Sequence, residues 1–236
     1  SIHCIGIGGS GVSALARYWA AKGWRVSGSD MSSSTLLDEL RSEGISVTIG
    51  HDARAVPRGV ERVVYSAAVR EDNPEMKEAR NRGISVISYA EALGELTKQY
   101  ITIAVSGAHG KSTTTALVSL MLIKAGFDPT VIIGTRLREF GGKNVRVGNS
   151  RYLVIEADEW NRSFWHYSPA IALITNVDKE HLDTYKNLRG VIAGFNHYVR
   201  QLPEGATVVV NAQDAKSMRA VRGAHCRVVA FNKSGK

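Results

Sequence analysis

Short runs of apolar, mostly β-branched residues alternate with amphipathic segments along the first hundred residues. The runs predict strands at 2–8, 25–27, 46–49, 62–65 and 85–87, and the intervening segments predict helices at about 12–22, 34–42, 74–82 and 89–98. In the first helix, apolar residues recur at Val12, Leu15, Ala16 and Trp19, close to the helical period. Strands and helices in this alternation predict a mainly parallel sheet covered by helices.

A second series of the same kind begins at residue 101. Strands are predicted at 101–105, 130–133, 152–155, 170–174, 207–210 and 227–231, and helices at 111–125, 188–201 and about 213–220. We therefore place a boundary near residues 98–100. The chain is predicted to hold two α/β domains, residues 1–98 and residues 99–236.

Composition excludes several classes of protein. Hydrophobic residues make up 44% of the 236 and charged residues 22%, which is typical of a globular protein and not of a disordered chain. No apolar run approaches the ~20 residues that span a bilayer, and the start is not typical of a signal peptide, so no membrane partner is expected. The two cysteines, Cys4 and Cys226, form no disulfide framework, which favours a reducing, cytoplasmic location.

The net charge of +8 is unevenly distributed. Residues 1–100 hold 12 basic and 12 acidic side chains, whereas residues 101–236 hold 18 basic and 10 acidic ones. Five of the basic residues lie between positions 136 and 151, against one acid, Glu139. This segment is either a solvated basic loop or a site for a polyanionic ligand. Its single aromatic residue, Phe140, gives no platform for stacked bases, so a nucleic-acid partner is not expected.

A glycine-rich loop follows the first predicted strand and opens the first helix. Residues 6–11 read G-x-G-x-x-G, and Asp30 lies 19 positions after Gly11, at the end of the second strand. Such a loop brings backbone N–H groups and a helix N-terminus against a pyrophosphate, and the acid can bind hydroxyl groups of a ribose. NAD and a UDP-sugar both carry a pyrophosphate, so an NAD-dependent oxidoreductase is one interpretation. A glycine-rich turn with a helix cap is the structural alternative.

A second glycine-rich loop follows the strand at 101–105 and opens the next helix. The sequence from 107 to 115 is GAHGKSTTT, and Val105 stands where a full Walker A motif has glycine, so the loop is a shortened variant. Its backbone can still hold phosphates, while Lys111 reaches the β- and γ-phosphates and Ser112 offers a hydroxyl to Mg²⁺. The predicted ATP-binding residues are Gly107, Ala108, His109, Gly110, Lys111, Ser112 and Thr113.

Carboxylates follow the strand at 152–155, and a histidine follows the strand at 170–174. Glu156, Asp158 and Glu159 come at a strand end, where open α/β sheets bind ligands, and carboxylate oxygens suit Mg²⁺. His181 is either a structural histidine or a ligand to a second metal ion. A polar strand end is the ordinary alternative for the acidic cluster.

These motifs, in this order, resemble the Mur ligase family. The resembling stretches extend over most of the chain and read GIGGSGVSALA (6–16), SGSD (27–30), IGHDA (49–53), VVYSAAVREDNPE (63–75), GAHGKSTTT (107–115), EADE (156–159) and NVDKEHLDTY (176–185). The resemblance implies a Rossmann-like parallel-sheet domain that binds a UDP-sugar, followed by a partial P-loop-type α/β ATPase domain. SGSD, GHDA and AHGK favour the branch that adds alanine, or the related branch that joins a recycled tripeptide to UDP-muramate.

The reaction that the resemblance implies is an ATP-dependent amide synthesis in peptidoglycan precursor formation. ATP phosphorylates the lactyl carboxylate of UDP-N-acetylmuramate, and the amine of L-alanine attacks the acyl phosphate. Lys111, Glu156 and His181 are the implied catalytic residues, and Ser112, Glu156 and His181 the implied Mg²⁺ ligands. The implied substrate-binding residues are Gly8, Gly9, Ser10, Gly11, Asp30, His51, Ser66 and His109.

Two of the departures from the family pattern bear most on function. Trp160, Asn161 and Arg162 follow EADE where the family usually has Ser-Asp, in a loop that lies near the acceptor carboxylate in the family. The chain also stops inside the second domain, so we expect a fragment without the C-terminal domain, inactive as a ligase by itself. A non-catalytic UDP-sugar-binding paralogue is the remaining alternative.

Overall fold

The computed structural model describes residues 1–232, which divide into two compact units. The first comprises Ser1–Ala92 and Gly134–Val147, and the second comprises Leu93–Ile133 and the chain from Gly148 onward. The predicted boundary lay after residue 98, whereas in the structure residues 93–98 belong to the second unit and residues 134–147 to the first. The assignment of functional domains to residues 1–98 and 99–236 stays a prediction.

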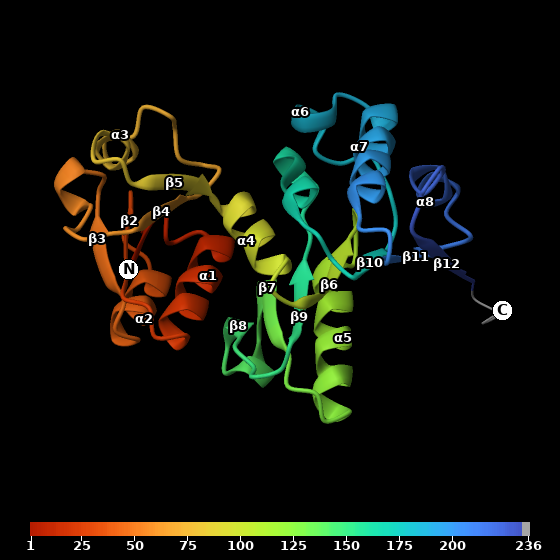
Figure 1. The fold of residues 1–236 in the computed structure, drawn as a ribbon, viewed down its shortest axis with the longest axis horizontal. Coiled ribbons are helices and arrows are strands. Elements are labelled where there is room, and N and C mark those ends of the chain that lie inside the picture. The colour runs from red at the N-terminus through yellow and green to blue at the C-terminus, as the bar shows by residue number, and fades with distance from the viewer. Residues whose placement is uncertain (233–236) are drawn as a thin grey trace. The chain divides into compact units, whose positions relative to one another are not determined.

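The first unit contains a five-stranded parallel sheet in the order β3-β2-β1-β4-β5 (Figure 1). Its strands are β1 (Ile2–Ile5), β2 (Val26–Asp30), β3 (Ser46–Ile49), β4 (Arg62–Tyr65) and β5 (Ser85–Ser88). Its helices are α1 (Ser10–Ala21), α2 (Thr35–Ser42) and α3 (Pro74–Asn81), and α4 (Tyr89–Thr97) continues into the second unit. Helices α1 and α2 lie on one face of the sheet and α3 lies on the other. The parallel strands confirm the predicted sheet and the Rossmann-like arrangement that the resemblance implied.

The strand predicted at 2–8 is shorter than expected. It ends at Ile5 because Gly6 has φ of +74°, a left-handed conformation that breaks the extended backbone. Helix α1 then begins at Ser10, two residues before the predicted start. The loop between them is therefore a tight turn at the carboxyl end of β1.

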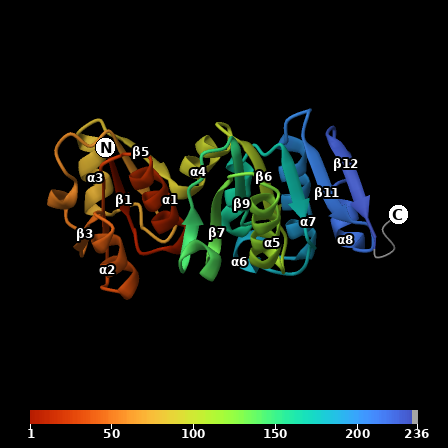
Figure 2. The same ribbon diagram turned by 90° about the horizontal axis from the view of Figure 1, so that it is seen from below.

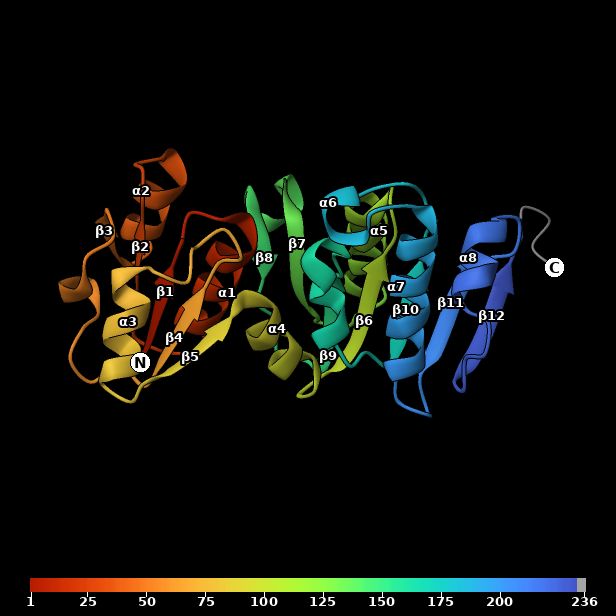
Figure 3. The same ribbon diagram turned by 90° about the horizontal axis from the view of Figure 1, so that it is seen from above.

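A seven-stranded sheet has the order β12-β11-β10-β6-β9-β7-β8, and its strands belong to the second unit except for residues 134–147, which belong to the first. The strands are β6 (Ile101–Ser106), β7 (Thr130–Leu137), β8 (Lys143–Arg146), β9 (Tyr152–Glu156), β10 (Ile171–Ile174), β11 (Thr207–Asn211) and β12 (Arg227–Phe231). The helices are α5 (Lys111–Lys124), α6 (Leu182–Tyr185), α7 (Leu188–Gln201) and α8 (Ala215–Ala220). Helix α5 lies in front of the sheet in Figure 2, and α7 and α8 lie in front in the opposite view of Figure 3. Phe164 packs in the core against Phe195 and Tyr198, with ring centroids 5.1 Å and 4.6 Å away.

The basic segment after residue 136 forms a hairpin that the sequence did not predict. Strand β7 runs on to Leu137, and β8 follows after a turn through Gly141 and Gly142. In the first unit, Arg136 pairs with Glu39 at 2.8 Å and Lys143 pairs with Glu43 at 3.1 Å. Part of the basic segment is thus matched by acids of α2 and the residue after it, which neither of the two interpretations of this segment anticipated.

Candidate functional site

A cavity of about 550 Å³ opens in the first unit at the carboxyl ends of its central strands. Gly6 and Gly9 follow β1, Asp30 ends β2, and Ser66 follows β4, so the cavity lies where the strand order reverses between β1 and β4. This switch point is where open parallel sheets bind ligands. Four of the predicted substrate residues line its wall, namely Gly9, Asp30, His51 and Ser66.

The other predicted residues of the first loop shape it rather than line the cavity. The N–H of Gly8 donates to Oδ2 of Asp30 at 2.8 Å, so Asp30 also anchors the loop. A Cβ on Gly11 would lie 2.5 Å from the ring of Tyr89, which explains why this position carries no side chain. The carbonyl of Ser10 accepts a hydrogen bond from Ser13 Oγ at 2.9 Å.

Behind the cavity, His51 is hydrogen-bonded to a carboxylate that the sequence analysis did not single out. Nδ1 of His51 lies 2.7 Å from Oε1 of Glu75, whose side chain is fully buried. Burial tends to raise the pKa of Glu75, but hydrogen bonds from His3, Ser29 and His51 hold it below its ordinary value. No sequence signal joins these groups, because Glu75 lies 72 positions from His3.

In the second unit, the loop after β6 has the geometry of a phosphate-binding loop. Gly107 has φ of +128°, and a Cβ there would lie 2.2 Å from Thr175 Oγ1. Gly110 is left-handed and begins α5 with no side-chain cap, so no side chain occupies the N-terminal N–H groups. Asn176 accepts from the N–H of His109 at 2.9 Å and returns a bond to its carbonyl. The loop is thereby fixed against the chain after β10, with amides available for an anion.

Lys111 is engaged by its own loop and by a buried acid. Its Nζ donates to the carbonyl of Gly107 at 2.7 Å and lies 3.2 Å from both carboxylate oxygens of Glu159. Glu159 is 1% exposed, and burial raises its pKa even though Lys111 opposes the rise. A phosphate that binds Lys111 therefore has to compete with Glu159. Of the remaining loop residues, Ala108 is buried, whereas Thr113 and His109 are exposed.

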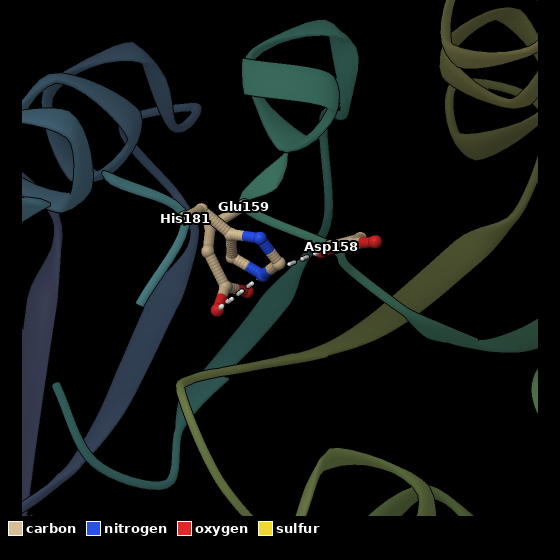
Figure 4. A group of neighbouring side chains, drawn as sticks. All are labelled: Asp158, Glu159 and His181. Carbon is tan, nitrogen blue, oxygen red and sulfur yellow. Dashed lines mark ion pairs between the residues drawn. The ribbon is translucent and has the colours of Figure 1, made fainter. Parts of the chain in front are cut away.

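The predicted Mg²⁺ ligands are only partly brought together. Ser112 Oγ donates to Glu156 Oε1 at 2.6 Å, which joins a hydroxyl and a carboxylate at the start of α5. His181 instead lies 3.9 Å from Asp158 Oδ1 and 3.7 Å from Glu159 Oε1 (Figure 4). These three side chains offer ligand atoms within 4.8 Å of one another. The oxygen-only pair suits Mg²⁺, while the group with an imidazole has a mixed ligand character.

The divergent loop after Glu159 is tied to the segment that carries His181. Trp160 Nε1 donates to Asp183 Oδ2 at 3.0 Å, and the N–H of Asn161 donates to Thr184 Oγ1 at 3.3 Å. Asn161, Arg162 and His181 have positive φ values of 50°, 58° and 51°, which are uncommon for residues other than glycine. Uncommon backbone conformations thus occur both in this loop and in the segment that carries His181.

Comparison with known proteins identifies the family of the chain. The profile of the Mur ligase family, catalytic domain, matches residues 1–101, and the profile of the Mur ligase middle domain matches residues 105–236. The chain belongs to the Mur ligase family. This confirms the resemblance drawn from the two glycine loops and the acidic motif, together with the α/β fold that it implied.

Several curated Mur ligases are similar to the chain over its whole length. It is 39% identical over 236 residues to the UDP-N-acetylmuramate–L-alanine ligase of Acetivibrio thermocellus, covering 100% of this chain and 50% of that protein. It is 44% identical over 229 residues to the enzyme of the same name from Aquifex aeolicus, covering 97% of this chain and 50% of that protein. The chain thus spans about half the length of these relatives.

Two solved Mur ligase structures have the same fold. The UDP-N-acetylmuramate–alanine ligase of Thermotoga maritima superposes with a TM-score of 0.85 at 31% identity, over 98% of this chain and 52% of that one. UDP-N-acetylmuramate:L-alanyl-γ-D-glutamyl-meso-diaminopimelate ligase from Neisseria meningitides gives a TM-score of 0.89 at 28% identity, over 98% and 77%. Within residues 1–232, no helix has the length and apolar character needed to cross a bilayer.

Proposed function

We propose that this chain provides the UDP-sugar and ATP sites of a UDP-N-acetylmuramate–L-alanine ligase. The observation that carries the proposal is the second loop, where Lys111 and the bonded pair Ser112 and Glu156 stand together at the N-terminus of α5. An NAD-dependent oxidoreductase would use the first loop and leave this second group without a role.

The residues present suit ATP with Mg²⁺. Ser112 and Glu156 would hold the ion, which supplies positive charge to the phosphate oxygens. Lys111 would bind the β- and γ-phosphates and stabilise the charge that develops as the γ-phosphoryl group passes to the lactyl carboxylate. The amine of L-alanine then attacks the acyl carbon, and the tetrahedral intermediate releases phosphate. Gly9, Asp30, His51 and Ser66 would hold the UDP part of the acceptor. The roles of His109 towards the muramyl group, and of Glu156 with His181 at a second metal ion, stay predictions.

A variant pair on one helix tests the proposal in the whole protein. Lys111→Ala should lower phosphate release that depends on both UDP-N-acetylmuramate and L-alanine by at least about a thousandfold, since the reacting phosphoryl group loses its cation. Lys124→Ala, at the other end of α5, should leave it within about twofold. Unchanged turnover in Lys111→Ala would contradict the proposal and favour a non-catalytic UDP-sugar-binding protein.

The related ligase that joins a peptide to the same sugar is a second candidate. It is favoured by the similarity to the Neisseria meningitides structure and by the unusual loop at Trp160, Asn161 and Arg162. Replacing L-alanine by L-alanyl-γ-D-glutamyl-meso-diaminopimelate in the same assay separates the two. Faster phosphate release with the tripeptide would assign the chain to the peptide-joining branch.

A further inference from the structure

A buried chain of polar side chains runs behind the cavity of the first unit. Oε2 of Glu75 lies 2.7 Å from Nε2 of His3, and its Oε1 lies 2.7 Å from both Ser29 Oγ and His51 Nδ1. His3 continues the chain through Nδ1 to Ser27 Oγ at 2.8 Å. Glu75 and His3 are 0% and 1% exposed, whereas the His51 side chain is 13% exposed and lines the cavity.

The position of Glu75 is determined by the start of α3. It is the second residue of that helix, after Pro74, and its N–H donates to the capping Asn73 Oδ1 at 2.8 Å. The positive end of the helix favours a carboxylate in the first turn. The side chain therefore has a defined place from which to bond to both histidines.

The hydrogen-bond pattern determines how the His51 ring is oriented. A carboxylate is an acceptor, so Nδ1 of His51 has to carry the proton that lies between it and Glu75. Nε2 is then the ring nitrogen left for the cavity, and within residues 1–232 no bond to it is recorded.

The buried carboxylate of Glu75 is satisfied by three donors. The ring N–H groups of His3 and His51 and the hydroxyl of Ser29 all bond to its oxygens. His3 is enclosed, whereas His51 lines the cavity. Glu75 therefore holds one ring that a ligand in the cavity can reach and one that it cannot.

We propose that Glu75 is a positioning residue of the nucleotide cavity, which fixes the His51 ring with its Nδ1–H on the buried carboxylate and its Nε2 towards the ligand. The ligand part of this inference rests on the proposed function, in which a UDP group occupies the cavity. Glu75 itself does not reach the ligand. It acts through His51, with His3 holding its second oxygen.

The tautomer of His51 can be measured without any ligand. In ¹⁵N NMR of the wild-type chain, Nδ1 of His51 should give the shift of a protonated ring nitrogen, and Glu75→Gln should move the ring proton towards Nε2. Glu71→Gln is the matched control, because Glu71 is an exposed acid that pairs with Arg80. An unprotonated Nδ1 of His51 in the wild-type chain overturns the proposal, even if Glu75→Gln fails to fold.

UDP binding gives the second readout. Glu75→Gln should weaken UDP binding about tenfold, because the His51 ring is no longer held in place. Glu71→Gln should bind UDP like the wild-type chain. A Glu75→Gln variant with wild-type affinity for UDP overturns the proposal. A wild-type chain that does not bind UDP contradicts the proposed function instead, while the NMR result still decides the tautomer of His51.

Discussion

The two glycine loops are similar in sequence but are supported by different chemistry. The first loop is held by the bond from Gly8 to Asp30, and the cavity beside it is supported by the buried chain through Glu75. The second loop is held by Asn176, and its cation Lys111 is paired with Glu159. Around the first loop, Glu75 holds the His51 ring towards the cavity. Around the second loop, Glu159 pairs with Lys111, the cation that a phosphate needs.

This difference predicts different responses to a ligand. In the first unit, polar groups of the cavity wall are already oriented, so binding requires little rearrangement. In the second unit, Lys111 and Ser112 must exchange bonds with Glu159 and Glu156 for bonds with the nucleotide or its metal ion. We therefore expect the first site to be preorganised and the second to exchange ionic partners when a ligand binds.

The largest expected effect comes from Gly107→Ala. Gly107 has φ of +128°, and the added methyl group would lie 2.2 Å from Thr175 Oγ1, so a side chain is both strained and obstructed. We expect a loss of about 3 kcal/mol in unfolding free energy and no detectable ATP binding, with UDP affinity unchanged. Thermal unfolding and calorimetric titration with each nucleotide measure these quantities.

The control for that substitution is Gly126→Ala. Gly126 also has a positive φ, +84°, but no atom lies within 4 Å of the added carbon. Gly126→Ala should lower the unfolding free energy by about 1 kcal/mol and leave ATP binding intact. If Gly107→Ala also bound ATP normally, the close packing of this loop would not be what forms the nucleotide site.

The pH dependence of stability tests the role of the buried carboxylate Glu75 behind the first loop. Because the pKa of Glu75 is lowered in the folded chain, its ionised form stabilises the fold above the pKa of the unfolded state, and this contribution is lost as pH falls through the folded value. At pH 7, Glu75→Gln should lower the unfolding free energy by about 2 kcal/mol. The difference in unfolding free energy between the variant and the wild type, measured by urea unfolding, should narrow progressively below about pH 5. A difference that stays constant down to about pH 3 would show that ionisation of Glu75 does not contribute to stability.

Local patterns were enough to predict both loops and most of the strands, because each depends on residues adjacent in sequence. The pairs that support the loops join distant residues, such as His3 with Glu75 and Arg136 with Glu39. No periodicity or spacing connects such positions, so the buried chain and the β7–β8 hairpin contacts were missed. For the same reason, the pairing of the basic segment with Glu39 was not predicted.

For the acidic motif, the sequence predicted the carboxylates but not which side chains they would contact. EADE predicted carboxylates at a strand end, and Glu156 is the last residue of β9 and is bonded to Ser112, whereas Asp158 and Glu159 follow after the strand has ended. The chain there turns into the irregular segment Trp160–His166, with two left-handed residues inside it. Sequence spacing could not show that His181 would lie beside Asp158 and Glu159.

The smallest expected effect is an increase in affinity. Glu159→Gln removes the charge that engages Lys111, so ADP without Mg²⁺ should bind about tenfold more tightly, because the lysine no longer has to leave an ion pair. Glu180→Gln is the matched control, since Glu180 faces His109 at 3.6 Å and is not paired with Lys111. Calorimetric titration of both variants measures the change. Equal affinities in Glu159→Gln and the wild type would show that Lys111 is not withheld from phosphate. Loss of the additional affinity that Mg²⁺ confers, with no gain in its absence, would instead make Glu159 a metal ligand together with Asp158 and His181.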